Sequence, residues 1–569
     1  WDDKTVTWNS LKSYVHNYSG LDGELTWENV LRSDVEYAYQ CCRFYGYREM
    51  MSEYLYTRNE DYAYCVLKRM MDFINDRTYG WPRTLDTAVR MEAWAGIFNY
   101  LVDLDYMDPD MCTAIIKEMY QSAVLCLMPS SATTANWIQT EKMNAYHVMN
   151  LFPEFAESEN IKSKIQDIFS EMIFKDYYDD GAYIEDTAGY NTGALNQYIR
   201  IRKFTTESGG AVIPEFDEII RKGAYWNLLM FAPGGAPTAY GDSGPGASLL
   251  TTRYQELVDW YGDYELQYID TYGAKGIEPS WTSKLYPTSS YAFMRSDWSN
   301  KAQYLFTNVR GGGTHGHYDD NSIIMFAYGR NLLCDAGYVT YSAGEDRALA
   351  MSTLNHNTIE INEENQQSPR AYTLKFDNIG ETTAWTANKN FDFLSQRTKG
   401  YDKIGNSHKR TITYVKPDFW IVSDYCAPTD KTEKNKYKQA WHMLPNSNLK
   451  FNNETKKVWS EFESGANIIV AGADYDAEVY ERKGIYTATY GQGVDAPYGC
   501  FEKNAFGDVT FDTVLFPYEG KGDMSVERID LGVATTVATA LKINTDKNGA
   551  KETIYYVLNY ADEMQRTFD

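Results

Sequence analysis

Cysteine pairs and long apolar runs are missing from this sequence. Its 569 residues include 8 cysteines, none of them in a Cys-x-x-Cys pair, so neither a disulfide framework nor a cysteine zinc site is indicated. No apolar run reaches the roughly 18 residues that a transmembrane helix needs, so we predict no membrane span. The chain begins at Trp1 without Met. We interpret this as removal of a signal peptide and expect a secreted, periplasmic or cell-surface protein.

Positively charged residues are also few relative to negatively charged ones. The 54 Lys and Arg residues are outnumbered by 79 Asp and Glu residues, which gives a formal net charge of −25. Binding to nucleic acid depends on clustered Lys and Arg that neutralise phosphates, so we exclude nucleic acid as a partner. The same surface repels anionic glycans at long range, and a protein that acts on them would need a locally basic groove.

Aromatic residues, in contrast, are abundant. Tyr occurs 48 times and Trp 14 times, and 43% of the residues are hydrophobic. This composition excludes a disordered chain. Tyr and Trp suit carbohydrate grooves because each offers an apolar face with a polar edge, although large cores use the same residues.

The hydrophobic period changes near residue 280. Apolar residues recur at helical spacing in the front part, over residues 35–45, 61–74, 85–104, 111–127 and 161–174. A period of two follows, which predicts strands over residues 304–309, 322–328, 357–361, 410–415, 419–423, 467–471 and 552–558. We therefore predict an α/α toroid over residues 1–280 and an antiparallel β-sandwich over residues 281–569. The less regular stretch from about residue 450 leaves room for a smaller β subdomain.

The 7 histidines of the chain are distributed unevenly. Two lie in Gly313-Thr-His315-Gly-His317, behind a run of glycines that lets a ligand approach closely, and a third is His356. With Asp335, the side chains of His317 and His356 would make a two-histidine, one-carboxylate site suited to zinc.

These segments resemble those of the heparinase II/III family of polysaccharide lyases. Alginate lyases of the same superfamily share the pattern. The matching stretches are His315 to Asp319, Gly329 to Gly337 and Ser352 to Thr358, and the resemblance extends over about residues 25–445. It implies an α/α toroid packed on an antiparallel β-sandwich, with the active site in a cleft between them. It also implies that His315 is catalytic. A divalent metal, zinc or calcium with a mainly structural role, would be bound by His317, Asp335 and His356.

Two segments of the helical half extend the resemblance. Ala135-Asn136-Trp137 to Glu141 is similar to the segment whose Asn neutralises the substrate carboxylate, and Trp137 stands where some relatives have His. This pair favours a heparinase III-like lyase that acts on lightly sulfated, glucuronate-containing chains. Asp180-Gly-Ala-Tyr-Ile-Glu185 to Tyr190 is similar to the block whose last Tyr is catalytic.

Several other polar residues are open to two interpretations. Arginines can bind carboxylate or sulfate through bidentate contacts but can equally be structural, and the candidates are Arg83, Arg90, Arg310 and Arg347. Trp137, Glu141 and Glu185 are further candidates for substrate binding. We interpret Gly241-Asp242-Ser243-Gly244 as a structured loop, because Pro245 stands where a nucleophile elbow needs Gly. His408 and His442 lie on predicted strands and suit the core or a supporting role.

β-Elimination from a uronate needs three chemical functions. A donor such as Asn136 must offset the carboxylate charge, a base must remove the adjacent proton, and an acid must protonate the leaving oxygen. We assign Tyr190 as the acid and His315 as a base. Two candidate bases, Tyr190 and His315, on opposite sides of the sugar would allow elimination from either epimer at that carbon. The chemistry therefore predicts a lyase that acts on an anionic polysaccharide such as heparan sulfate, chondroitin or hyaluronan.

Four alternatives remain open from the sequence. The first is an alginate lyase, and the second is a glycoside hydrolase on the same toroid, for which carboxylates are available at Asp86, Asp179, Asp180 and Glu185. The third is a non-catalytic glycan-binding protein. The fourth concerns Tyr190, which could act as the base as well as the acid. The sequence gives no oligomeric state.

Overall fold

The structure is a computed structural model that describes residues 42–75, 83–128, 135–244, 252–310, 315–341, 343–366 and 380–560. The chain divides into two compact units. The first comprises Trp1–Lys175 and Gly193–Asp217, and the second comprises Asp176–Thr192 and Glu218–Asp569. The chain passes from one unit to the other at the last residue of helix α9 (Ser158–Asp176) and inside helices α10 (Ala188–Glu207) and α11 (Pro214–Leu229). The domain boundary at residue 280 stays a prediction, because compact units and sequence domains need not coincide.

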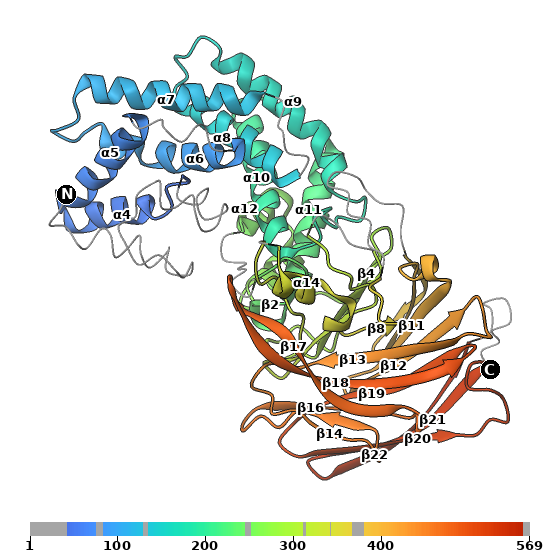
Figure 1. Cartoon of the computed structure of the whole chain (residues 1–569). Coiled ribbons are helices and arrows are strands. Elements are labelled where there is room, and N and C mark those ends of the chain that lie inside the picture. Colours follow the sequence, from blue (N-terminus) through green and yellow to red (C-terminus); the bar gives the residue numbers. More distant parts are fainter. Residues whose placement is uncertain are drawn as a thin grey trace. The chain divides into compact units, whose positions relative to one another are not determined.

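The first unit is helical, drawn in blue to green in Figure 1. Its described helices are α4 (Tyr47–Thr57), α5 (Glu60–Asn75), α6 (Thr84–Leu101), α7 (Pro109–Leu127), α8 (Ala135–Leu151) and α9 (Ser158–Asp176). Local sequence sets their ends. Asp108 caps α7 by accepting a hydrogen bond from the Met111 amide at 2.8 Å, and Pro109 occupies the first helical position. Helix α6 packs against α7 and α8 and buries most of its length, including Trp94.

The structure differs from two predicted helix boundaries. The helix expected over residues 35–45 is not found in its described part, because residues 42–46 form a turn that ends at Gly46 with φ +86°. Residues 35–41 lie outside the described residues. Helix α6 ends at Leu101, three residues earlier than expected, and a turn follows. No helix among the described residues is long and apolar enough to cross a membrane.

The second unit is built mainly from antiparallel sheets. An eight-stranded sheet has the order β14-β15-β16-β19-β12-β11-β10-β9, and a four-stranded sheet has the order β17-β18-β13-β8. Their strands are β8 (Ile359–Ile361), β9 (Gly380–Ala387), β10 (Phe391–Thr398), β11 (Asn406–Val415), β12 (Phe419–Pro428), β13 (Lys434–His442), β14 (Lys450–Asn452), β15 (Lys457–Trp459), β16 (Ala466–Gly472), β17 (Glu478–Thr489), β18 (Gln492–Phe506) and β19 (Val509–Glu519).

Two smaller sheets and several short elements complete this unit. The five-stranded sheet contains β3 (Lys284–Tyr286), β4 (Tyr291–Arg295), β5 (Tyr304–Asn308), β6 (Ile323–Ala327) and β7 (Arg330–Leu333). The three-stranded sheet contains β20 (Gly522–Ile529), β21 (Ala538–Lys547) and β22 (Ala550–Asn559). The short elements are β1 (Phe231–Ala232), η1 (Pro233–Gly235), β2 (Ala236–Pro237), α12 (Tyr254–Tyr261), α13 (Tyr264–Asp270), α14 (Glu345–Met351), η3 (Thr353–Asn355) and η4 (Asp402–Ile404).

The eight-stranded sheet is buried on both faces, as strand β12 illustrates. Trp420 and Val422 belong to a core shared with the five- and four-stranded sheets, whereas Phe419 and Ile421 belong to a core shared with β20–β22. Successive residues of a strand point to opposite faces, so apolar residues are needed at every position here. This explains why residues 419–422 form an unbroken apolar run.

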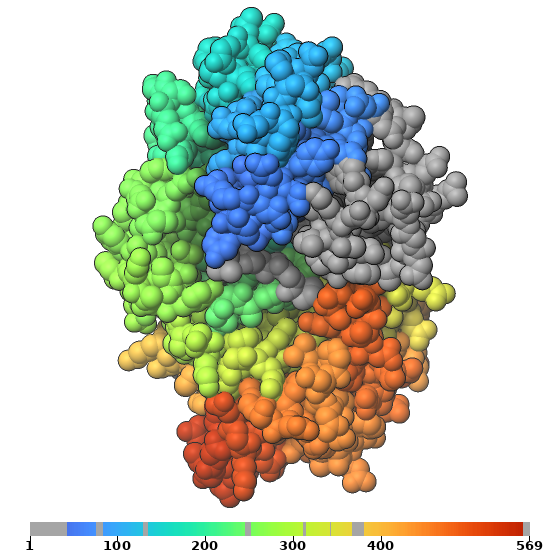
Figure 2. Space-filling view, turned by 90° about the vertical axis from the view of Figure 1, so that its left-hand side faces the viewer, coloured from blue at the N-terminus to red at the C-terminus, as the bar shows by residue number. Residues whose placement is uncertain are grey.

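Strands after residue 450 share sheets with strands before it. Strand β19 pairs with β12, and β18 pairs with β13. In Figure 2 the surface of these later strands, orange to red, adjoins that of the earlier ones. A smaller C-terminal β subdomain would therefore have to be limited to β20–β22.

Candidate active site

Tyr190 and His315 form a stacked pair in the second unit. Tyr190 lies in the first turn of α10, and its ring centroid is 3.7 Å from that of His315 with 10° between the ring planes. The Tyr190 hydroxyl lies 2.7 Å from the Tyr341 hydroxyl, which in turn lies 3.5 Å from His315 Nδ1. The two rings therefore lie face to face. That two bases on opposite sides of the sugar would allow either epimer to react stays a prediction.

The acidity of Tyr190 is set by its surroundings. Burial raises the pKa of the Tyr190 hydroxyl well above its usual value and outweighs the hydrogen bond with Tyr341. The hydroxyl therefore keeps its proton at neutral pH. This is the state that a general acid needs at the start of a reaction.

Glu185 lies next to the other ring nitrogen of His315. The carboxylate is buried, and its Oε2 is 3.7 Å from His315 Nε2. Its position follows from the turn before it, in which Gly181 has φ +96° and a Cβ there would lie 2.4 Å from Lys222 Cβ. The glycine of the Asp-Gly-x-Tyr-x-Glu block thus allows the turn that carries Glu185.

Asp242 contacts three side chains of the site. Its Oδ2 lies 3.1 Å from His315 Nδ1 and its Oδ1 lies 3.1 Å from His317 Nε2, while the Arg347 guanidinium pairs with both oxygens. Burial alone would raise the pKa of Asp242, but the hydrogen bonds from His315, His317 and Arg347 outweigh it and hold the pKa below its usual range. Asp242 is therefore ionised at neutral pH.

His317, Asp335 and His356 come together as the sequence predicts. One potential ligand atom from each lies within 4.8 Å of the others, and all three residues are buried. Asp335 Oδ2 is 3.1 Å from His356 Nδ1, and Asp335 Oδ1 accepts a hydrogen bond from the Gly337 amide at 3.0 Å. His317 Nδ1 and His356 Nε2 are buried without a hydrogen-bond partner among the described residues. Nitrogens left in this state suit a metal ion, so the donor set fits one.

Arg310 is enclosed by protein groups. It contacts the Asp186 carboxylate, donates to the Ile184 carbonyl at 2.7 Å and lies over the Tyr178 ring at 4.9 Å. Asp186 also accepts a hydrogen bond from the Tyr291 hydroxyl at 2.8 Å. Binding of substrate by Arg310 stays a prediction, and this enclosure favours a structural role.

The remaining predicted residues lie in the first unit. Asn136 is in the first turn of α8, next to Trp137, and the Arg83 guanidinium lies 5.1 Å from the centre of the Trp137 ring. Glu141 is buried on the same helix and accepts a hydrogen bond from the Thr84 hydroxyl. Arg90 is fully buried over the Phe73 ring, 3.7 Å from Glu118. The structure therefore places Arg83 next to Trp137, the neighbour of Asn136 on α8, and leaves Arg90 in the core.

Two models of one family together match most of the chain. The Heparinase II/III N-terminus matches residues 3–268, and the Heparinase II/III-like C-terminal region matches residues 278–496. The chain belongs to the heparinase II/III family. A heparin-sulfate lyase of Pedobacter heparinus is 21% identical, over 91% of this chain and 81% of that protein. A heparin-sulfate lyase of Bacteroides thetaiotaomicron is also 21% identical, over 94% of this chain and 80% of that protein.

Solved structures of this family share the fold. A crystal structure of heparinase III has a TM-score of 0.81 at 19% identity, with 95% of this chain and 86% of that chain covered. A heparan sulfate lyase from Pedobacter heparinus has a TM-score of 0.70 at 19% identity, with 98% and 90% covered. This likeness confirms the predicted fold, an α/α toroid followed by an antiparallel β-sandwich.

Sequence reasoning missed the roles of two residues in this heparinase II/III site. The sequence assigns Asp242 only to a structured loop. Tyr341 was not singled out at all, because it is one of 48 tyrosines and its contact with Tyr190 joins residues 151 positions apart. The histidines His408 and His442 are buried and bonded to Asp424 and to the Leu354 carbonyl, at 2.7 and 2.9 Å. They are core residues.

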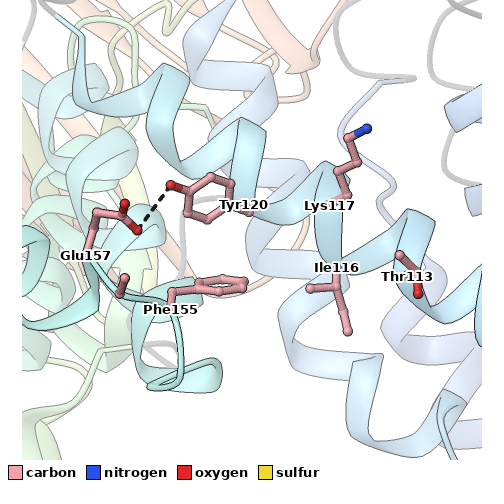
Figure 3. A pocket seen from close by; sticks show the side chains of 7 residues that line it. Thr113, Ile116, Lys117, Tyr120, Phe155 and Glu157 are labelled. Carbon is pink, nitrogen blue, oxygen red and sulfur yellow. Dashed lines mark hydrogen bonds between the residues drawn. The ribbon is translucent and has the colours of Figure 1, made fainter.

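A surface pocket of about 370 Å³ lies elsewhere, in the helical unit. It is lined by α7 residues such as Lys117 and Tyr120 and by Phe155 and Glu157 from the segment between α8 and α9 (Figure 3). The Tyr120 hydroxyl lies 3.3 Å from Glu157. None of the predicted site residues lines this pocket, so we do not assign the chemistry to it.

Proposed function

We propose that this lyase of the heparinase II/III family cleaves glycosaminoglycans next to a uronic acid by β-elimination, and that heparan sulfate is its substrate. The observation that carries the proposal is the stacked pair of Tyr190 and His315, held by Asp242 in a largely buried cluster. Support for the substrate comes from the relatives, which are named heparin-sulfate lyases.

The proton transfers follow from the two side chains. His315 Nε2 takes the proton from the carbon next to the carboxylate, and the adjacent Glu185 carboxylate stabilises the positive charge that results. Tyr190 gives its proton to the departing glycosidic oxygen, and the Tyr341 hydroxyl stabilises the phenolate through their 2.7 Å hydrogen bond. Asn136 donates its amide to the substrate carboxylate and offsets the charge of the enolate-like intermediate.

A cluster of three tyrosines, one of which lies next to His315, suits the neighbouring sugar. Tyr338 lies 5.1 Å from Tyr341 and 5.3 Å from Tyr490, measured between ring centroids, and Tyr341 is 40% exposed. Tyrosine suits such a sugar because its ring offers an apolar face and its hydroxyl a polar edge. In the first unit, Arg83 and Trp137 would contribute a cation and a further aromatic face, and Glu141 would support them.

His317, Asp335 and His356 would hold the divalent metal, for which we propose zinc. When bound, the ion supplies a fixed positive charge that orders the segment carrying His315. Elimination consumes no water, so a water-activating role is not required. Because a polysaccharide cannot enter a cell intact, we propose that the protein acts outside the cytoplasm.

The test is a substrate screen with purified protein. Heparan sulfate, chondroitin sulfate, hyaluronan and alginate are each incubated with it, and the ultraviolet absorbance of unsaturated uronate is followed. We expect the highest rate on heparan sulfate. A higher rate on alginate than on every glycosaminoglycan would refute the substrate assignment, and sugar release without this absorbance would indicate a hydrolase.

A further inference from the structure

The loop that carries Asp242 contacts His315 and the residue that precedes Tyr190. The Asp242 amide donates to the His315 carbonyl at 2.9 Å, and the Ser243 hydroxyl accepts from the amide of Gly189, the residue before Tyr190, at 3.3 Å. At Gly241 φ is +56°, and a Cβ there would lie 2.6 Å from the His315 carbonyl oxygen. This close approach requires glycine.

We infer that Asp242 is a positioning residue that fixes the tautomers of two imidazoles at once, those of His315 and His317. An ionised carboxylate can only accept hydrogen bonds. Its two oxygens each lie 3.1 Å from one ring nitrogen, His315 Nδ1 and His317 Nε2. Each of these nitrogens must therefore carry the hydrogen of its ring.

In the neutral form of each ring, the opposite nitrogen carries the lone pair. These nitrogens are His315 Nε2 and His317 Nδ1, and both are buried without a hydrogen-bond partner among the described residues. One of them is the atom that takes the proton in the proposed reaction, and the other is free to bind a metal ion. The role of His315 in this inference depends on the proposed function, whereas the assignment of the tautomers does not.

Arg347 keeps the carboxylate in this orientation. Its guanidinium pairs with both oxygens of Asp242, with 2.9 Å between Nη2 and Oδ2, and lies 5.5 Å from the centre of the Tyr341 ring. The bidentate pair with Arg347 fixes the plane of the Asp242 carboxylate. The carboxylate therefore cannot rotate to favour one imidazole over the other. The positive charge also balances the buried carboxylate.

Asp242→Asn tests the inference, because asparagine keeps the shape but replaces one acceptor oxygen by an NH2 donor. The amide can then suit only one of the two imidazoles, and the other must change tautomer. We expect kcat on heparan sulfate to fall at least about 100-fold while KM changes less than about threefold. Asp263→Asn is the matched control, since Asp263 accepts from Tyr225 and the Leu266 amide away from this cluster. It should retain wild-type kcat.

A double-mutant cycle separates positioning from general structural damage. If Asp242 acts through His315, adding Asp242→Asn to His315→Ala should lower kcat by less than about threefold more. Nitrogen NMR of protein with labelled histidine reads the tautomers directly and does not depend on turnover. We expect the His315 and His317 signals to show Nδ1–H and Nε2–H, respectively, and at least one of them to change in Asp242→Asn.

The outcomes are distinguishable. Wild-type kcat in Asp242→Asn, a full additional loss in the His315→Ala background, or the opposite tautomers in the wild type would each overturn the inference. A wild type that forms no unsaturated product from any glycosaminoglycan would instead refute the proposed function, and the spectra would still decide the tautomers.

Zinc titrated alone into Asp242→Asn should bind about 10–100-fold more weakly than to the wild type. Unchanged zinc affinity would remove His317 from the inference.

Discussion

At the scale of single residues, this site depends on which atoms face each other. The sequence identifies His315, Tyr190 and the metal-binding triad because His is rare and because short motifs surround these residues. It does not identify Tyr341 or the role of Asp242, since both act through contacts with residues far away in the chain. Residue type and motif predict the chemistry, whereas partners require the fold.

Tyr190→Phe tests the proposed acid. The change keeps the ring and its stacking on His315 but removes the transferable proton. We expect kcat to fall by roughly 100-fold or more, because general acid–base groups contribute about 10²–10⁴. KM should change little, since the lost interaction belongs to the transition state. The loss of one hydrogen bond to Tyr341 should lower the free energy of unfolding by about 1 kcal/mol.

The matched control is Tyr120→Phe. This change also removes a tyrosine hydroxyl with one side-chain partner, Glu157, but it lies in the helical surface pocket. Its kcat should equal that of the wild type. Full activity in a well-folded Tyr190→Phe protein would exclude Tyr190 as the acid and leave His315 or Tyr341 to protonate the leaving oxygen.

At the scale of elements, the metal-binding triad shows why loops between strands carry function. Asp335 follows β7 and His356 follows η3, so the two residues are positioned by the ends of regular elements. Sequence spacing suggested the triad, but only pairing of the strands brings its atoms within 4.8 Å.

His356→Ala should lose the bound metal. We expect the metal content of the purified protein to fall and its melting temperature to drop, and a chelator should lower the melting temperature of the wild type only. His408→Ala is the control, because His408 is an equally buried histidine with a carboxylate partner in the core. It should lose stability but keep its metal. A metal-free wild type would rule out the site.

A valine in the eight-stranded sheet and one in the three-stranded sheet should differ in how much they contribute to stability. Val422 on β12 is completely buried, whereas Val557 on β22 is 65% exposed. Val422→Ala should lower the free energy of unfolding by about 1–3 kcal/mol, as expected for removing two buried methyl groups. Val557→Ala should change it by less than about 0.5 kcal/mol. The midpoints of urea unfolding measure the change in stability of both variants. Equal effects would contradict the burial of β12 on both faces of its sheet.

At the scale of the whole molecule, composition and period predicted the architecture well. A helix buries one stripe of its surface, which gives the helical spacing of the front part of the chain. A strand buries alternate residues, which gives the period of two in the back part, and the fold confirms this change. The irregular pattern after residue 450 was harder to interpret. Strands there pair with both large sheets, and burial on two faces removes the alternation that identifies a strand.

Stability should depend on pH through buried neutral histidines. Burial lowers the pKa of His442 to about 4, and burial also lowers that of His147 to about 4. The unfolded chain binds these protons at a pKa near 6.5. Stability is therefore fully present above about pH 6.5 and is lost as pH falls toward 4, by roughly 3 kcal/mol for His442.

His442→Gln should weaken this pH dependence. The glutamine amide can still donate to the Leu354 carbonyl, which His442 Nε2 contacts at 2.9 Å, but it binds no proton. We expect the melting temperature of the variant to fall less than that of the wild type between pH 6.5 and 4.5. Parallel curves would show that His442 keeps its ordinary pKa in the folded protein.

The face-to-face contact of Tyr190 and His315 has a stereochemical consequence. If both side chains act as proposed, two rings stacked 3.7 Å apart would meet the sugar from one side. Removal of the proton and protonation of the leaving oxygen must then occur on the same face of the pyranose, which is a syn elimination. In glucuronate the C5 hydrogen and the C4 oxygen share a face, and in iduronate they do not. The enzyme should therefore cut glucuronate linkages and leave iduronate linkages of the same chain intact.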